Sequence, residues 1–420
     1  MIEAHRRAIR KSTFRLPAFT IKCAAILLAA SSIALSQAKP KPTNVQFAAG
    51  HSALNIPFDF EFNEIVVTVR VNDSAPLKFM FDTGAGASLL SARKAAGLNL
   101  KQVDRVKATG VGGSLKGTLA KGVSLSVPGV KVTNQRLVLL PLDFPFCEGR
   151  DIEGIIGYDF IKEFVVEIDY EARTISLFEP SSYQYPGPGD VIPLTITNTP
   201  RVHARIALPG KPPIEGQFEI DTGSDGVLSI NSPFVNRHKL LSALSAQVSD
   251  RGRGLGGESQ RIDARLGNLQ LGRFTIATPI VSFSLDTKGS LAAEDNDGPI
   301  GNEILRRFKV TIDYSRQRMM LEPNVHLSDS FESGMSGIEI DAEGKDCRIF
   351  KVADVSEKSV AAQAGILAGD EIVAIDGTPA NQFTSNQIEK LLMQDGAQRS
   401  LTLRRDGKAR VVKIKLRRRI

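Results

Sequence analysis

The chain has 420 residues, which is enough for two or three domains of ordinary size. Its hydrophobic content of 42% and charged content of 24% are those of a soluble globular protein and exclude wholesale disorder. Residues 1–38 hold 6 of the 53 basic and 1 of the 46 acidic side chains, so residues 39–420 are nearly neutral. We interpret the three arginines at 417–419 as a solvated tail rather than a nucleic-acid site.

Residues 1–38 have the three-part layout of a secretory signal peptide. Basic residues come first, an apolar stretch follows from Cys23 to Leu35, and the segment ends in Ser36-Gln37-Ala38. An uncleaved anchor is the alternative, but 13 apolar residues at 1.5 Å each fall short of the roughly 30 Å of hydrocarbon in a bilayer. We therefore expect a periplasmic or secreted protein with no stable membrane insertion once the leader is removed.

The middle of the chain contains an internal repeat. Four segments recur in the same order, with an offset of 139 residues for the first and 144 for the other three. The pairs are Phe79–Gly84 with Phe218–Gly223, Gly110–Gly113 with Gly254–Gly257, Ile156-Gly157 with Ile300-Gly301, and Phe164–Tyr170 with Phe308–Tyr314. One order with a single five-residue insertion indicates a duplicated domain.

Both copies are predicted to be β structure. Val67, Val69 and Val71 alternate with residues of the opposite face, turn residues recur at short intervals, and neither copy has a long stretch of helical periodicity. A Pro- and Gly-rich join at 180–189 separates the copies. We predict a signal peptide at 1–38, one all-β lobe at 39–186 and a second at 187–327.

The pattern changes after Pro323. Strands are predicted near Cys347–Val352 and Glu371–Ile375, a helix over Ser385–Met393, and a final strand pair around the turn Asp406-Gly407. These elements predict a separate α+β domain at 330–420. The fold class is therefore mainly β, with two all-β lobes and this C-terminal domain. Cys147 and Cys347 lie too far apart in sequence to support a disulfide or a zinc site.

Asp82 and Asp221 each open an Asp-Thr-Gly motif after an apolar strand. A single such motif is read as a turn whose aspartate bonds backbone amides, but two at one place in a repeat point to a pair. Carboxylates about 3 Å apart cannot both ionise, so the pair would hold one proton. The ionised member could activate a water while the protonated member binds a substrate carbonyl, which hydrolyses a peptide bond with no metal and no cofactor.

These motifs are similar to those of pepsin- and retropepsin-type aspartic proteases, over roughly residues 45–323. The resemblance implies two retropepsin-like lobes in a pseudo-two-fold bilobal acid-protease fold, a polypeptide substrate, and Asp82 and Asp221 as the catalytic pair. It further implies loop bracing by Thr83, Gly84, Thr222 and Gly223, flaps around Gly110, Gly112, Gly113, Gly254, Gly256 and Gly257, and strands that cross beneath the loops at Gly157 and Gly301.

The chain departs from the pepsin pattern near these motifs. Neither flap contains a tyrosine, and Ala85 stands where the second copy keeps a serine, Ser224. In retropepsins this alanine accompanies a less acidic working pH, so the resemblance implies milder acidity than that of pepsin. Asp225 has no acidic counterpart in the first copy; it either perturbs the pair or caps the following turn, and we favour the turn.

Residues 332–418 resemble a bacterial PDZ domain, above all over Ser359–Gly377. The resemblance implies that an extended peptide, often a protein C-terminus, adds to a sheet edge. It places Ser336, Gly337 and Ile338 in the loop that holds the peptide carboxylate. The alternative is a spacer that only supports the two lobes.

Two functions remain open at this point. One is an active endopeptidase with a peptide-binding accessory domain; the other is a catalytically silent cleft that only binds peptides. Retention of both aspartates, threonines and glycines favours the enzyme, because a binding protein needs neither carboxylate. The copies could pair within one chain or between chains, and their presence in one chain favours the former.

The G-x-G-x-x-G pattern at 252–257 lacks the strand–helix context of a nucleotide site.

Overall fold

The computed structural model of the protein describes residues 43–61, 63–142, 152–244, 246–344 and 348–420. The predicted signal peptide, Cys147 and Cys347 lie outside the described residues. Within the described ranges, no helix is both long enough and apolar enough to span a membrane.

Among the described residues of lobe 1, nine strands form one sheet in the order β1-β9-β6-β10-β5-β4-β8-β7, with β3 paired to β4. Its apolar residues alternate as expected, so that Val67, Val69 and Val71 all point into the core. The strands are β1 (Asn44–Phe47), β3 (Asp59–Glu61), β4 (Glu64–Val71), β5 (Leu77–Phe81), β6 (Leu89–Ser91), β7 (Gln102–Gly110), β8 (Gly113–Val127), β9 (Val130–Leu140) and β10 (Ile152–Ile156), and the short helices are α1 (Ala92–Ala95) and α2 (Tyr158–Ile161).

Lobe 2 repeats this arrangement as two sheets, β21-β20-β15-β16-β23 with β14 on β15, and β17-β22-β19-β18. The strands are β14 (Thr195–Ile196), β15 (Pro200–Ala207), β16 (Ile214–Ile220), β17 (Ser229–Ile230), β18 (Val248–Gly254), β19 (Gly257–Arg265), β20 (Asn268–Leu271), β21 (Phe274–Ala277), β22 (Ile280–Ser284) and β23 (Pro299–Ile300). The helices are α3 (Ser232–Arg237), η1 (Leu240–Ala243), η2 (Ser290–Ala292) and α4 (Asn302–Leu305).

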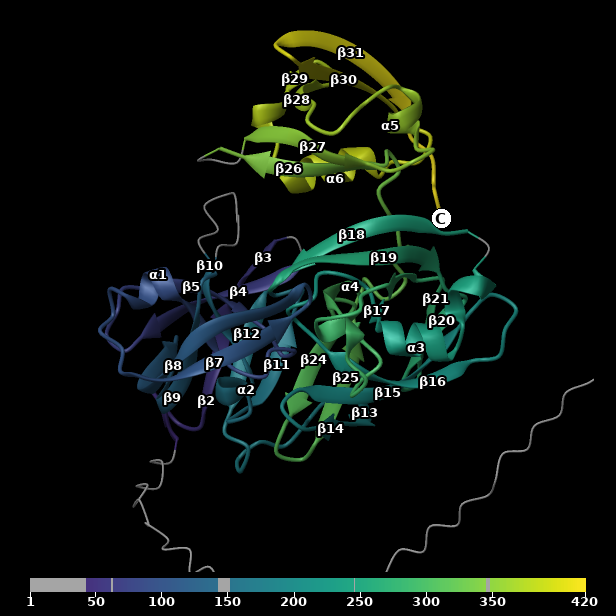
Figure 1. Cartoon of the computed structure of the whole chain (residues 1–420). Helices are drawn as coiled ribbons and strands as arrows, with labels where there is room; N and C mark the ends of the chain where they lie inside the picture. The colour runs from purple at the N-terminus through teal and green to yellow at the C-terminus, as the bar shows by residue number, and fades with distance from the viewer. Residues whose placement is uncertain (1–42, 62, 143–151, 245, 345–347) are drawn as a thin grey trace, which may run out of the picture. The chain divides into compact units, whose positions relative to one another are not determined.

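A sheet shared by both lobes relates them by an approximate two-fold axis. Its order is β13-β25-β24-β11-β12-β2, built from β2 (Ser52–Pro57), β11 (Val165–Asp169), β12 (Thr174–Phe178), β13 (Asp190–Pro193), β24 (Phe308–Asp313) and β25 (Arg318–Pro323). At its centre β11 and β24 run antiparallel, as seen in Figure 1, with Glu167 opposite Thr311. These two residues are 144 positions apart, which is the repeat offset, so equivalent residues face each other at the axis.

One buried hydrophobic core runs through both lobes, and a second core belongs to the C-terminal domain alone. That domain has the sheet β26-β27-β28-β30-β31, with β29 paired to β28. Its elements are β26 (Ile338–Glu343), β27 (Ile349–Val355), α5 (Val360–Gln363), β28 (Glu371–Ile375), β29 (Thr378–Pro379), η3 (Ala380–Gln382), α6 (Ser385–Leu392), β30 (Gln398–Arg405) and β31 (Lys408–Lys415). The prediction of a mainly β fold with a C-terminal α+β domain is confirmed.

Candidate active site

Asp82 and Asp221 leave their sheets at equivalent points. Asp82 directly follows β5, which runs parallel to β10, and Asp221 follows β16, which runs parallel to β23. The backbone N–H of Asp82 donates to the carbonyl of Ile156, and that of Asp221 to the carbonyl of Ile300, both at 3.0 Å. The same strand pair in each lobe therefore delivers one aspartate to the shared floor of a cleft.

Thr83 and Thr222 fasten the two loops to each other. The hydroxyl of Thr83 donates to the carbonyl of Ile220 at 2.6 Å and accepts from the N–H of Thr222 at 3.0 Å. The hydroxyl of Thr222 donates to the carbonyl of Phe81 at 2.7 Å and accepts from the N–H of Thr83 at 3.0 Å. Both threonines are buried, so these four bonds fix the relative position of the loops and hence of the carboxyl groups.

Gly84 and Gly223 make room for the opposite carboxyl group. A Cβ atom at Gly84 would lie 2.5 Å from the carboxyl carbon of Asp221, and one at Gly223 would lie 2.3 Å from that of Asp82. Each N–H also donates to the aspartate of its own loop, at 2.9 Å. A side chain at either position would push the two carboxyl groups apart.

The two carboxyl groups shift each other's pKa in opposite directions. Burial, followed by the charge of Asp221 and a hydrogen bond to it, raises the pKa of Asp82 well above its ordinary value. Burial also raises the pKa of Asp221, although the N–H of Gly223 opposes that shift. A coupled pair of this kind holds one proton at a pH where isolated aspartates have lost theirs.

Asp225 has both of the roles that the sequence left open. Burial raises the pKa of its carboxyl group, and the backbone N–H groups of Asp225 and Gly226 oppose that shift, as is expected of a residue at the start of a turn. Its charge is also among the causes that raise the pKa of Asp221.

Gly157 and Gly301 lie where strands pass beneath the loops. A Cβ atom at Gly157 would lie 2.7 Å from the carbonyl oxygen of Ala85, and one at Gly301 would lie 2.7 Å from that of Ser224. The next residues bond the same carbonyls: the N–H of Tyr158 reaches Ala85 and the N–H of Asn302 reaches Ser224, each at 2.8 Å. These contacts support the loops from below.

The six glycines expected in the flaps occupy the tips of two hairpins, β7–β8 and β18–β19, the second of which is prominent in Figure 1. The tips touch: the N–H of Gly112 donates to the carbonyl of Leu255 at 3.1 Å. A Cβ atom at Gly112 would lie 2.2 Å from the backbone of Gly257, and one at Gly256 would lie 2.7 Å from the backbone of Gly113. Both lobes thus contribute a hairpin at the position predicted for a flap, and glycine lets the tips pack backbone against backbone.

In the C-terminal domain, Ser336, Gly337 and Ile338 form the loop that leads into β26. Gly337 has a φ of +75°, and a Cβ atom there would lie 2.2 Å from Cβ of Ser359. The hydroxyl of Ser336 accepts from the N–H of Ile338 at 3.1 Å. In the described sheet β26 pairs with β27 and forms an edge, which leaves its other side available to an added strand.

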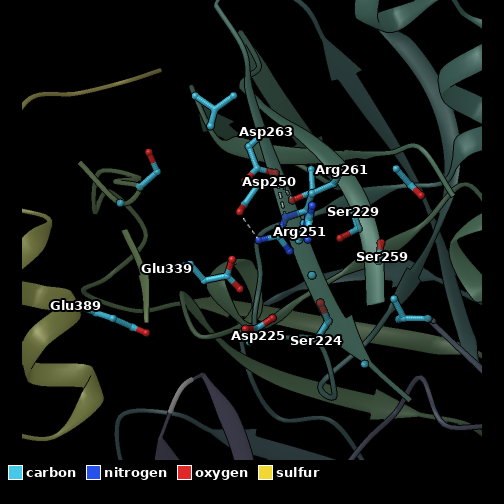
Figure 2. Close-up of a pocket in the computed structure, with 18 of the residues that line it drawn as sticks. Ser224, Asp225, Ser229, Asp250, Arg251, Ser259, Arg261, Asp263, Glu339 and Glu389 are labelled. Carbon is cyan, nitrogen blue, oxygen red and sulfur yellow. Dashed lines mark hydrogen bonds and ion pairs between the residues drawn. The ribbon is translucent and has the colours of Figure 1, made fainter. Parts of the chain in front are cut away.

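The sequence did not point to several charged residues of lobe 2 that lie beside the pair. Glu219 is half-buried two residues before Asp221, and burial followed by the charge of Asp221 raises its pKa to about 8. Figure 2 shows a further group, in which Arg261 lies beside Asp250 and Asp263, and it shows Asp225 apart from them, next to Ser224. In the repeat, Glu219 occupies the position equivalent to Met80. This difference between the copies is the feature of the sequence that could have identified Glu219.

Arg261 holds that group together. Its guanidinium bonds Asp250 at 2.8 Å and lies 3.4 Å from Asp263, which also accepts the hydroxyl of Ser282 at 2.7 Å. Within the described residues, no three His, Cys, Asp or Glu side chains are grouped as metal ligands would be.

Comparison with protein families finds two matches. Residues 67–160 match a family model described as aspartyl protease, and residues 351–405 match one described as PDZ domain. No curated protein matches the chain. The first match includes Asp82 and ends before Asp221, so the place of Asp221 rests on the repeat and on the geometry above.

Proposed function

We propose that this chain, which contains an aspartyl protease domain and a PDZ domain, is an aspartic endopeptidase that uses Asp82 and Asp221 to activate a water. One observation carries the proposal: the reciprocal bonds of Thr83 and Thr222 hold two half-buried carboxyl groups together at the floor of a cleft. A protease or peptide-binding role follows from the two domains alone, and the carboxyl pair favours hydrolysis.

The reaction follows from the shared proton. The ionised carboxylate accepts a proton from a water held between the two groups, and that water attacks the peptide carbonyl. The protonated carboxyl donates to the carbonyl oxygen as negative charge develops on it. The tetrahedral intermediate then collapses: the carboxyl group that took the proton of the water gives it to the leaving nitrogen, the other carboxylate takes back the proton from the former carbonyl oxygen, and no covalent enzyme intermediate forms. Burial raises the pKa of Asp82, so the pair keeps its shared proton as pH rises from strongly to mildly acidic values. The pair therefore stays active in mild acid.

The experiment is to incubate the purified full-length protein with an unfolded protein substrate from pH 3 to 8. We expect cleavage in mild acid, and a loss of at least about 10³-fold in Asp82→Asn and Asp221→Asn, as is usual when an essential catalytic group is removed. Cleavage that survives in both variants would overturn the role of the pair. A wild-type protein that binds the substrate but cleaves it at no pH would instead indicate a silent peptide-binding protein.

The C-terminal domain is proposed to bind peptide or protein C-termini along β26. The open edge of β26 supplies backbone groups for an added strand, and the loop of Ser336, Gly337 and Ile338 lies where a terminal carboxylate would be held. A labelled peptide with a free C-terminus should bind the full-length Asp82→Asn variant at least about tenfold more tightly than its C-terminal amide. Equal affinities would favour a spacer role.

We further propose that the protein acts in the periplasm or outside the cell, after removal of residues 1–38. The layout of the leader in the sequence is the support for this step. Expression of the full-length chain in a Gram-negative bacterium should give a periplasmic product that begins at Lys39. A cytoplasmic product that retains Met1 would contradict the proposal.

A further inference from the structure

The two walls of the cleft descend from one repeat but differ in chemistry. On the lobe 1 side, Met80 lines the cleft and packs in an apolar cluster outside the main core with Leu115, Val138 and Leu140, the last of which is fully buried. Their repeat equivalents on lobe 2, at offsets of 139 or 144, are Glu219, Ser259, Ser282 and Ser284. The three serines line the cleft, as Met80 does.

Acidic side chains dominate the polar wall. Asp250 and Asp263 flank the partly buried guanidinium of Arg261, as Figure 2 shows, while Asp225 lies beside Ser224 and the other lining cation of this lobe, Arg251, is exposed. The residues of lobe 1 at the equivalent positions are Gly86, Val106, Leu119 and Gly117, so the repeat has no such group on the other side. Besides Asp82, lobe 1 contributes the acidic lining residue Glu64, which adjoins Asn63, whose side chain bonds the backbone of Asp225 at 3.2 Å.

Asp225 is the acid in the best position to meet a ligand. It lies one residue from Ser224 in the catalytic loop, is exposed within the cleft, and makes no ion pair within 4.0 Å with a described side chain. By contrast, Asp250 and Asp263 already bond the guanidinium of Arg261. A second cation that entered here could bind the Asp225 carboxylate without breaking an ion pair.

Successive side chains of an extended peptide point in opposite directions, so the two residues that flank the scissile bond meet different walls. We infer that the cleft selects a bond between an apolar residue, held by the lobe 1 wall, and a lysine or arginine, held by the acidic wall of lobe 2. This inference rests on the proposed endopeptidase function and names its substrate class.

The first test is to digest a denatured protein mixture with the full-length protein and sequence the new termini by mass spectrometry. We expect an apolar residue on one side of the cleaved bond and lysine or arginine on the other, each enriched several-fold over its background frequency. Apolar residues on both sides, or an enrichment of acidic residues, would overturn the inference while leaving the hydrolytic function in place.

The variant Asp225→Asn tests whether the acidic wall causes the preference for lysine or arginine. Asp225→Asn removes a charge with little change of shape, and we expect it to lower the ratio of kcat/KM for a lysine peptide over its norleucine analogue about tenfold. The matched control is Asp104→Asn, an exposed aspartate on the flap hairpin of lobe 1. An unchanged ratio in Asp225→Asn, or an equal change in Asp104→Asn, would contradict the assignment.

Failure of hydrolysis can be told apart from failure of this inference. If the wild-type protein cleaves nothing, the same peptides can be tested for binding by fluorescence anisotropy, with amidated C-termini so that the PDZ domain has no carboxylate to hold. A preference for lysine over norleucine or glutamate that disappears in Asp225→Asn would support the inference without the enzyme. Equal affinities for all three peptides would overturn it.

Discussion

Thr83 shows how much of the site depends on single hydroxyl groups. Its hydroxyl donates to the carbonyl of Ile220 and accepts from the N–H of Thr222. Both of these backbone groups belong to the other lobe and are buried. Thr83→Val keeps the shape of the side chain and leaves both groups unpaired, at a cost of about 1–3 kcal/mol each. We expect Tm to fall by roughly 4–10 °C and kcat to fall at least about tenfold. Thermal melts and peptide kinetics measure the two effects.

Thr83→Ser is the matched control for that prediction, because it keeps the hydroxyl and removes one methyl group. We expect it to retain most of the activity and to melt within about 3 °C of the wild type. If Thr83→Val melted and cleaved as well as Thr83→Ser, the hydroxyl would have no role in fastening the loops.

At the scale of elements, the flap hairpins should act as a pair because their tips touch. Gly112→Ala would place a Cβ atom 2.2 Å from the backbone of Gly257, so the tips must separate. We expect KM to rise about tenfold as closure over the substrate weakens, with little change in Tm, because neither tip is part of the main hydrophobic core. Peptide kinetics and a thermal melt test both expectations.

Gly97→Ala controls for a general loss of glycine. Its Cβ atom would lie 3.8 Å from the nearest backbone oxygen, an ordinary contact, and Gly97 is exposed. It should leave both KM and Tm unchanged. A normal KM in Gly112→Ala would mean that the flaps open and close independently of each other.

The elements also mark the limit of what sequence could predict. The repeat placed both aspartates, both flaps and both crossing strands, because each depends on local turn chemistry that glycine and threonine make visible. In the C-terminal domain, the predicted strand Glu371–Ile375 and the turn Asp406-Gly407 agree with the structure. Alternation showed which residues share a face of a strand, but not what that face meets. The ion pairs of Arg261 and the contact between flap tips depend on pairing between distant strands and were not predicted.

At the scale of the whole molecule, the stability of the fold should depend on pH in two ranges. Carboxyl groups with a raised pKa determine one range, and carboxyl groups with a lowered pKa determine the other. Burial raises the pKa of Glu219 to about 8 and that of Asp263 to about 6. For Asp370, hydrogen bonds from Arg405 lower the pKa; for Asp313, burial acts in the opposite direction but hydrogen bonds from Ser315 and two arginines outweigh it. The first two groups favour folding when protonated, and the last two when ionised.

The signs follow from proton binding. The folded protein binds more protons at Glu219 and Asp263 than the unfolded chain does, so their contribution to stability is lost as pH rises from about 4.5 to about 8. It binds fewer at Asp313 and Asp370, whose contribution is lost as pH falls below about 4. We expect Tm to be highest near pH 4.5–5.5 and to fall by a few degrees by pH 8 and more steeply below pH 4. Calorimetry from pH 3 to 9 measures the curve.

Two variants separate the acidic and the neutral parts of the curve of Tm against pH. Glu219→Gln stays neutral at every pH, so it should flatten the fall between pH 5 and 8 without changing the acid limb. Asp313→Asn should lower Tm above pH 4 and weaken the dependence below it, because the bonds that its charge accepts are lost at every pH. A Tm that rose steadily from pH 5 to 8 in the wild type would contradict the raised pKa values. Such a curve would also remove the basis for a carboxyl pair that keeps its proton in mild acid.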